Sequence, residues 1–216
     1  MTKIVAISDT HGHVIKNLPK ADLLIHSGDW SGRGTYEDTL KFMVWMESIR
    51  HNYKEIICVP GNHERWVQDF LPLARKEFKE RGLLLLVDEP MNFDSYKIYG
   101  YPWTPMFHNW AFNADDDKRE KLLSNITPDI DILISHGPPF ETLDKLDEYG
   151  SEPGAHVGCK KLKNFFLNSY TPPELVIFGH IHNQSGITKE FETIFVNAAS
   201  VNEQYKIDQP YKVIYL

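Results

Sequence analysis

Short apolar runs recur along the chain, and most of them end at a polar residue beside a glycine. The clearest of these runs are residues 4–8, 23–26, 55–60, 131–135 and 175–178. Apolar runs of this length, bounded by turn-forming residues, are typical of buried β-strands. We also expect a strand at 83–87, a hairpin partner for it at 95–100, a hairpin over 186–197 and a last strand at 211–216.

Between these strands lie segments in which apolar residues recur at helical spacing. The expected helices cover residues 35–53, 66–81, 115–125 and 158–170. Thr35 is a good N-cap for the first of them, and Gly82 is a typical residue to end the second. The aromatic-rich segment 101–113 and the charged segment 140–157 are expected to be loops. Strands that alternate with helices predict an α/β fold. We find no repeat and no linker, so we expect one domain over residues 1–216.

Composition narrows the class of protein. The chain has 216 residues, of which 42% are hydrophobic and 25% charged, as in an ordinary globular protein. Its net charge of −7 argues against a stable nucleic-acid partner, which would need a basic surface. Cys58 and Cys159 do not suggest a disulfide framework. Without a signal peptide or an apolar run of membrane-spanning length, we expect a cytoplasmic protein with no membrane partner. The sequence leaves the oligomeric state open.

Polar side chains that suit a metal gather at the ends of the predicted strands. They are Asp9, His11, Asp29, Asn62, His63, His136, His180 and His182. Open α/β sheets bind their ligands at the carboxyl ends of the strands, so these side chains should converge on one site. Carboxylate, amide and imidazole ligands together suit Mn, Fe, Zn or Co. The absence of cysteine from the set argues against a structural zinc site.

The order of these motifs resembles the calcineurin-like metallophosphoesterase superfamily. They run Asp9-x-His11, Gly28-Asp29, Gly61-Asn62-His63-Glu64, His136 and Gly179-His180-x-His182. A closer resemblance is to the metallophosphoesterase-domain-containing proteins. It rests on the runs Ser135–Pro139, Pro102–Pro105, Trp110–Asn113 and Val157–Cys159, together with Ile181-His182, and covers nearly the whole chain. The resemblance implies a two-sheet β-sandwich flanked by helices.

The same resemblance implies a centre of two divalent metal ions, with Mn expected and Fe, Zn, Co or Ni as alternatives. Asp9, His11, Asp29 and His182 would hold the first ion. Asp29, Asn62, His136 and His180 would hold the second, so that Asp29 bridges the two. A hydroxide between the metals would be the nucleophile. His63 would protonate the departing alkoxide, which makes Asp29 and His63 the implied catalytic residues.

The implied activity is hydrolysis of a small phosphoester substrate. Phosphodiesters are the first expectation. The leaving group of a diester is a poor alkoxide, so its departure gains most from a positioned acid such as His63. By resemblance, cyclic nucleotides are the expected class. A phosphomonoesterase or a nuclease of the same superfamily remains open. So does a metal- or nucleotide-binding module with vestigial activity.

Several residues near the motifs have two interpretations. His26 lies inside a strand, which favours a supporting or core role over metal ligation. Arg33 and Arg65 would either contact substrate phosphate or form structural ion pairs. The aromatic residues of 101–113 would either stack on a nucleobase or hold the loop down as a satellite core, and we favour the core. These aromatic residues are Trp103, Phe107, Trp110 and Phe112.

Overall fold

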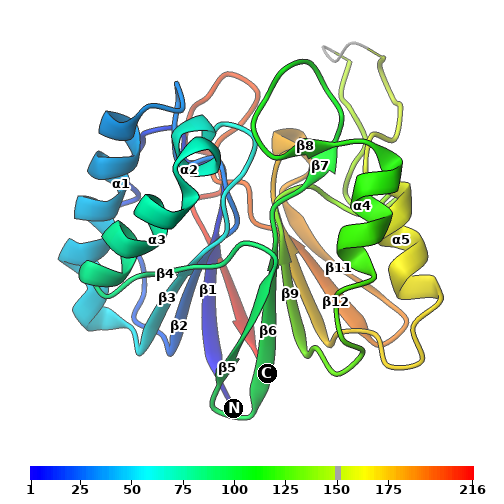
Figure 1. Cartoon of the computed structure of the whole chain (residues 1–216), viewed down its shortest axis with the longest axis horizontal. Helices are drawn as coiled ribbons and strands as arrows, with labels where there is room; N and C mark the ends of the chain where they lie inside the picture. The colour runs from blue at the N-terminus through cyan, green and yellow to red at the C-terminus, as the bar shows by residue number, and fades with distance from the viewer. Residues whose placement is uncertain (149–151) are drawn as a thin grey trace.

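The computed structural model describes residues 1–148 and 152–216, and within them the chain builds two mixed sheets (Figure 1). The first sheet has the strand order β13-β1-β2-β3-β4. Its parallel strands are β1 (Lys3–Ile7), β2 (Leu23–His26), β3 (Glu55–Cys58) and β4 (Leu84–Leu85). The edge strand β13 (Lys212–Tyr215) runs antiparallel to β1.

The second sheet has the order β11-β12-β10-β9-β6-β5. Four parallel strands form its middle: β12 (Thr193–Asn197), β10 (Leu175–Phe178), β9 (Ile132–Ser135) and β6 (Tyr96–Tyr101). The edge strands β11 (Gly186–Glu190) and β5 (Glu89–Phe93) are antiparallel to their neighbours. A separate parallel pair, β7 (Thr104–Pro105) and β8 (Asn113–Ala114), lies within and just after the predicted loop 101–113.

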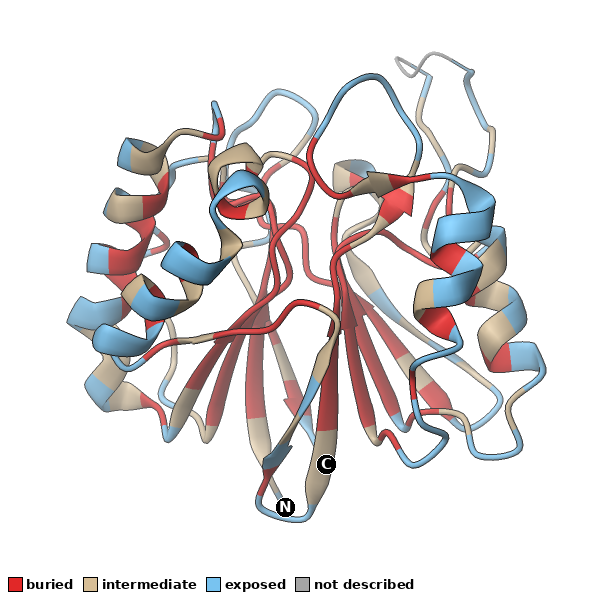
Figure 2. Cartoon of the chain, in the orientation of Figure 1, coloured by how far each residue is buried: buried red, intermediate tan, exposed pale blue. Residues whose placement is uncertain are grey.

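Alternation along the strands gives each sheet two apolar faces. Ile4 and Ala6 of β1 lie in the core between the sheets, whereas Val5 and Ile7 lie in the core beneath the helices. Because side chains alternate across a strand, each sheet can pack on its partner sheet and on helices at once. The buried strands in the middle of Figure 2 and their covering helices therefore form four layers. The predicted helix-flanked two-sheet fold is confirmed.

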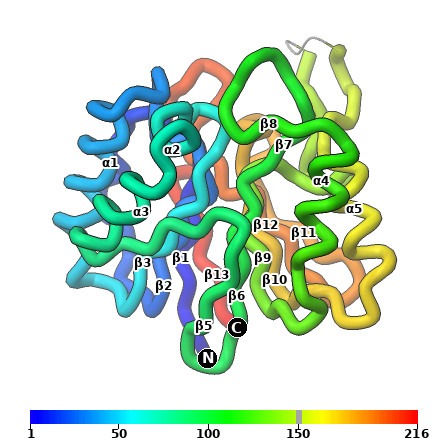
Figure 3. The backbone as a smooth tube through the Cα atoms, in the orientation of Figure 1, coloured from blue at the N-terminus to red at the C-terminus, as the bar shows by residue number. Residues whose placement is uncertain are grey.

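Helices cover the outer face of each sheet, as the tube in Figure 3 shows. The first sheet is covered by α1 (Tyr36–Ile49), which continues into the short η1 (Arg50–Asn52), and by α2 (Arg65–Asp69) with α3 (Leu71–Glu80). The second is covered by α4 (Asp116–Leu123) and α5 (Lys160–Leu167). In the part of the chain that the structure describes, no helix has the length and apolar character needed to cross a bilayer.

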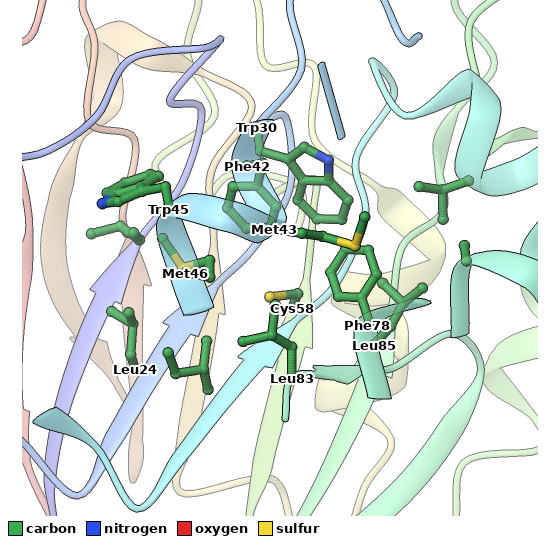
Figure 4. Packing of buried hydrophobic residues seen from close by; sticks show 14 of the residues in the cluster. Leu24, Trp30, Phe42, Met43, Trp45, Met46, Cys58, Phe78, Leu83 and Leu85 are labelled. Carbon is green, nitrogen blue, oxygen red and sulfur yellow. The ribbon is translucent and has the colours of Figure 1, made fainter. Parts of the chain in front are cut away.

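A cluster of aromatic side chains lies in the core between the first sheet and its helices (Figure 4). The ring of Trp30 stacks on Phe42 at a centroid distance of 4.6 Å, and both contact Phe78. Such pairs contribute about 0.5–1.5 kcal/mol beyond the burial of their area. Since Trp30 directly follows Asp29, this packing also fixes the loop that carries the Asp29 carboxylate.

The predicted helix over 66–81 is in fact two helices. The chain breaks at Phe70, whose φ and ψ are −124° and 38°, and restarts with Pro72 in the first turn of α3. Proline has no N–H to donate to the residue four positions earlier and clashes with the preceding turn, so one continuous helix cannot form. Pro72 is the sequence signal for this break.

The predicted pairing of 83–87 with 95–100 is wrong. Only Leu84–Leu85 forms a strand, and it pairs with β3 in the first sheet, whereas β6 belongs to the second. The hairpin partner of β6 is β5, which contains Pro90. Proline is tolerated there because β5 is an edge strand. The segment between β4 and β5 is where the chain crosses from one sheet to the other. The predicted 186–197 hairpin is confirmed as β11–β12.

Candidate metal centre

The carboxyl ends of five parallel strands meet at one end of the sandwich. In the first sheet, β1, β2 and β3 are neighbours and lead to Asp9, Asp29 and Asn62. In the second sheet, β9 and β10 are neighbours and lead to His136, His180 and His182. This shared edge lies at the upper end of the strands in Figure 1, away from both termini.

Every residue predicted as a metal ligand lies in this place. Three groups have ligand atoms within 4.8 Å of one another: Asp9, His11 and His182; His11, Asp29 and His63; and Asp29, His136 and His180. Asn62 joins them through its Oδ1 atom, which lies 2.9 Å from Nε2 of His136. The groups share His11 and Asp29, so they form one continuous centre.

Four histidines of the centre turn the same ring nitrogen inward. Nδ1 of His11, His63 and His136 lies 2.9–3.2 Å from the carbonyl oxygens of Ser31, Gly32 and Ser27 respectively. Nδ1 of His182 lies 3.3 Å from the carbonyl oxygen of Asn202. A carbonyl only accepts, so each Nδ1 must carry a proton, and each Nε2 is the nitrogen left to bind a cation or a second proton. Three of the four carbonyls come from the loop after β2, which therefore sets the ligand orientation.

These inward nitrogens face other groups that also carry lone pairs. Nε2 of His11 lies 3.3 Å from Nε2 of His182, which is 3.5 Å from Oδ1 of Asp9. Nε2 of His136 lies 3.3 Å from Oδ2 of Asp29. Among residues 1–148 and 152–216, no group donates a hydrogen bond to the buried Oδ1 of Asp9. Converging lone pairs and an orphaned carboxylate oxygen need positive charge between them, so the donor set fits divalent cations.

The pKa values show how the chain alone balances this charge. Burial opposes ionisation of Asp29, but His136, His63 and His11 outweigh it and hold its pKa well below the usual range. Burial also opposes the charged form of His136, yet the Asp29 carboxylate raises its pKa to about 9. Burial and the charge of His136 lower the pKa of His180 to about 4. A proton on His136 thus occupies the position that a cation would take.

The backbone at the strand ends is left-handed at four predicted ligands. The φ angles are 53° at Asp9, 43° at His11, 58° at Asp29 and 71° at His180. Residues other than glycine rarely adopt this backbone conformation. It persists only where the surrounding structure holds the chain in place. Hydrogen bonds tie three of these residues to the neighbouring chain, since Asp9 Oδ2 accepts from the backbone N–H of His180 and Asp29 Oδ1 accepts from that of His63.

Comparisons with known proteins identify the family of the chain. Residues 2–184 match the family model described as calcineurin-like phosphoesterase. The chain belongs to the calcineurin-like phosphoesterase family. It is 32% identical over 236 aligned residues to metallophosphoesterase domain-containing protein 1 of Homo sapiens and of Mus musculus, covering 99% of this chain and 70% of each relative.

The fold of this calcineurin-like chain also resembles a solved structure. The crystal structure of phosphopantetheinyl hydrolase from Mycobacterium tuberculosis aligns with a TM-score of 0.62 and covers 98% of this chain and 95% of that one. At 16% sequence identity the likeness concerns the fold alone.

Glu64 is a residue of the centre to which sequence reasoning gave no role. Its buried carboxylate accepts hydrogen bonds from the backbone N–H groups of Asp29, Ser31 and Gly61 at 2.6–3.0 Å. It therefore ties the loop after β2 to the loop after β3. Burial and the nearby Asp29 charge raise the pKa of Glu64 to about 8, and the three N–H donors oppose that rise. Its place directly after Asn62-His63 was the available signal.

His26 supports the centre without facing it. Its Nδ1 accepts from the backbone N–H of Gly28, so Nε2 carries the proton and donates to Oγ1 of Thr10 at 3.0 Å. Both nitrogens are used, and burial lowers the pKa of His26 to about 3. The predicted supporting role agrees with these contacts.

The aromatic loop 101–113 divides into a buried and an exposed part. Trp103 packs against the cores and Phe112 is fully buried, as predicted for a satellite core. Phe107 and Trp110 are instead exposed, and the Trp110 ring lies 4.5 Å from the ring of His63. Arg65 donates to the carbonyl of Asn109 at 2.8 Å, so it holds this loop, and no contact with phosphate is needed to explain it.

Proposed function

We propose that the chain hydrolyses small phosphodiesters at a centre of two divalent cations. The observation that carries the proposal is the common orientation of His11, His63, His136 and His182, which turn Nε2 toward two buried carboxylates. Family membership supports the phosphoesterase reaction, and the preference for diesters is our own inference from His63.

The ligand sets follow from which donor atoms lie together. Asp9, His11, Asp29 and His182 would hold one cation; Asp29, Asn62, His136 and His180 would hold the other. Oxygen and nitrogen donors without sulfur favour Mn, with Fe, Zn, Co or Ni as alternatives. When bound, such cations supply activation of the attacking water and neutralise charge on the phosphoryl group. Asp29 has an oxygen near each set, which suits a bridging ligand.

His63 has the geometry of a general acid. Its Nδ1 is fixed by the carbonyl of Gly32, and its Nε2 points toward the centre, 3.9 Å from Oδ2 of Asp29. The ring is held between His11 at 4.7 Å and Trp110 at 4.5 Å. A proton on Nε2 would pass to the departing ester oxygen, which matters most when that oxygen leaves as a poor alkoxide. Diesters of ordinary alcohols, such as cyclic nucleotides, are therefore the favoured substrate class.

The test is turnover of bis(p-nitrophenyl) phosphate by metal-stripped protein, with and without added Mn²⁺, beside p-nitrophenyl phosphate. We expect metal to restore cleavage of the diester and to favour it over the monoester. Preference for the monoester would replace the diesterase proposal with a phosphomonoesterase. Tight binding of metal without turnover of either ester would favour a binding module.

A further inference from the structure

A half-exposed tyrosine lies against the metal centre from a segment with no predicted role. Tyr205 belongs to the loop between β12 and β13, beyond the residues 2–184 that match the family model. Its ring centroid lies 4.8 Å from that of His11 and 5.5 Å from that of His182. Both contacts are edge-on, with interplanar angles of 77° and 88°. The residue as a whole is 50% exposed to solvent.

The loop holds Tyr205 in place through its backbone. Oδ1 of Asn202 accepts from the N–H groups of Gln204 and Lys206 at 3.0 and 3.1 Å, and the carbonyl of Asn202 accepts from Tyr205 at 2.8 Å. The carbonyl of Tyr205 lies 2.9 Å from Nε2 of His13. Tyr205 itself has a left-handed φ of 57°. The ring is thus presented at the centre by a closed loop, although it fills no core.

Tyr205 and Trp110 border different parts of the centre. Trp110 contacts His63, the proposed acid, and His11 contacts both His63 and Tyr205. Within residues 1–148 and 152–216, no ring contact joins His63 to Tyr205. The leaving group of a diester must approach His63, since that residue supplies its proton. The second ester group stays on phosphorus and would then point away from His63 and Trp110, toward the ring of Tyr205.

We propose that Tyr205 is a specificity-determining residue that packs against the ester group retained on phosphorus and favours retained groups with a planar ring. The inference rests on the proposed function and names the part of the substrate that this loop recognises. Contact of a planar group with an aromatic side chain changes affinity by roughly 5- to 150-fold on alanine substitution. The ring carries this contact, so the hydroxyl group is dispensable.

The experiment keeps the leaving group constant and varies the retained group. Methyl p-nitrophenyl phosphate and phenyl p-nitrophenyl phosphate both release p-nitrophenolate, and differ only in the group that stays on phosphorus. We expect Tyr205→Ala to lower the phenyl-over-methyl ratio of kcat/KM by about tenfold, mainly through KM. Tyr205→Phe should keep the ratio. Tyr170→Ala, which removes a fully exposed tyrosine near the end of α5, is the matched control and should keep it too.

A second readout does not depend on turnover. Phenyl phosphate and methyl phosphate are the products that keep the varied group, and calorimetry gives their affinities for metal-loaded protein. The ratio of these affinities should fall in Tyr205→Ala as the kinetic ratio does. An unchanged ratio in both measurements overturns the inference, and so does an equal loss on both substrates accompanied by loss of bound metal. If the unmutated protein with metal bound cleaves neither diester, the proposed function itself fails and the inference falls with it.

Discussion

Asp29 is the residue on which the centre depends most. Its carboxylate faces His136 and His63 and also accepts the backbone N–H of His63. We expect Asp29→Asn to lose bound metal and activity together, because the amide keeps the shape but removes the charge that two cations would share. Metal affinity should fall at least about 100-fold, more than for a supporting residue. Metal content by mass spectrometry and diester turnover measure this.

Asp69→Asn, on the exposed end of α2, is the control and should change neither quantity. Full activity in Asp29→Asn would rule out the proposed ligand sets.

Substitution of His63 should slow the hydrolysis of some substrates strongly and of others only slightly. His63→Gln removes the proton donor but leaves a side chain of similar reach. Esters with alkoxide leaving groups should slow by about 10²–10⁴-fold, and those that release p-nitrophenolate much less. Steady-state kinetics on a series of leaving groups measures the dependence, with His51→Gln as an exposed control. Equal losses along the series would remove His63 from the acid role.

Glu64 links two loops that carry candidate ligands. Substituting it should therefore affect both the stability of the chain and its binding of metal. Glu64→Gln places an NH₂ group among three backbone N–H donors and leaves at least one of them unpaired. An unsatisfied buried donor costs about 1–3 kcal/mol. For a chain of this size that lowers Tm by about 2–4 °C for each kcal/mol. Thermal melts and metal content should both fall, whereas Glu192→Gln, on the exposed β11–β12 turn, should leave them unchanged.

The strand ends need glycine because backbone and ligands approach so closely. A Cβ at Gly179 would overlap the Asp9 carboxylate and the Ser8 side chain. We expect Gly179→Ala to displace Asp9 or His180 and to weaken metal binding, with a stability cost of about 1–3 kcal/mol. Gly186→Ala is the control, since the nearest atom to its added Cβ lies at 3.7 Å. If calorimetric metal affinity matches that of the unmutated chain, Asp9 is not a ligand.

The sequence predicted the elements that carry the site better than the elements between them. Each ligand-bearing strand is a buried apolar run with a polar end, and both features are local, so Asp9, Asn62 and His136 could be placed without a structure. The pairing of 83–87 with 95–100 failed because sheet membership depends on contacts distant in sequence. The break at Phe70, by contrast, has a local sequence signal in Pro72.

Support for the centre was less visible in the sequence than the centre itself. Glu64 acts through three backbone N–H groups, and its place directly after Asn62-His63 marks the residue but not these partners. Tyr205 comes from a loop that reaches the candidate ligands His11 and His182 only when the second sheet packs on the first. Side-chain type indicates candidate ligands, but the residues that orient them depend on tertiary structure.

The candidate ligands come from both sheets, so metal binding would be coupled to the packing of the sandwich. Asp9, Asp29 and Asn62 follow strands of one sheet, and His136 and His180 follow strands of the other. A ligand that binds only the folded chain stabilises it by about 2.7 kcal/mol at a hundredfold excess over Kd. Added Mn²⁺ should therefore raise Tm by about 5–10 °C for a chain of this size.

The pH dependence of stability should differ between the metal-free and the metal-loaded chain. In the metal-free chain the pKa of His136 is about 9, above its ordinary 6.5, so its proton stabilises the fold fully below pH 6.5 and is lost through pH 9. The raised pKa of Glu64, about 8, acts in the same direction. The lowered pKa of His180, about 4, costs stability only as pH falls below 6.5.

Metal-free protein should therefore lose stability from pH 7 to pH 9, by at most about 1.4 kcal/mol per pH unit for each proton released. With Mn²⁺ bound, a cation would take the position of the His136 proton, so that Tm should fall much less over the same range. Calorimetric melts of stripped and loaded protein at pH 7, 8 and 9 measure the two slopes. Metal-free His136→Asn is the control, because it lacks the titrating ring and should show a flatter slope than the stripped parent. Parallel slopes for the stripped and loaded chains would mean that metal and proton do not compete at His136, which would remove this residue from the second ligand set.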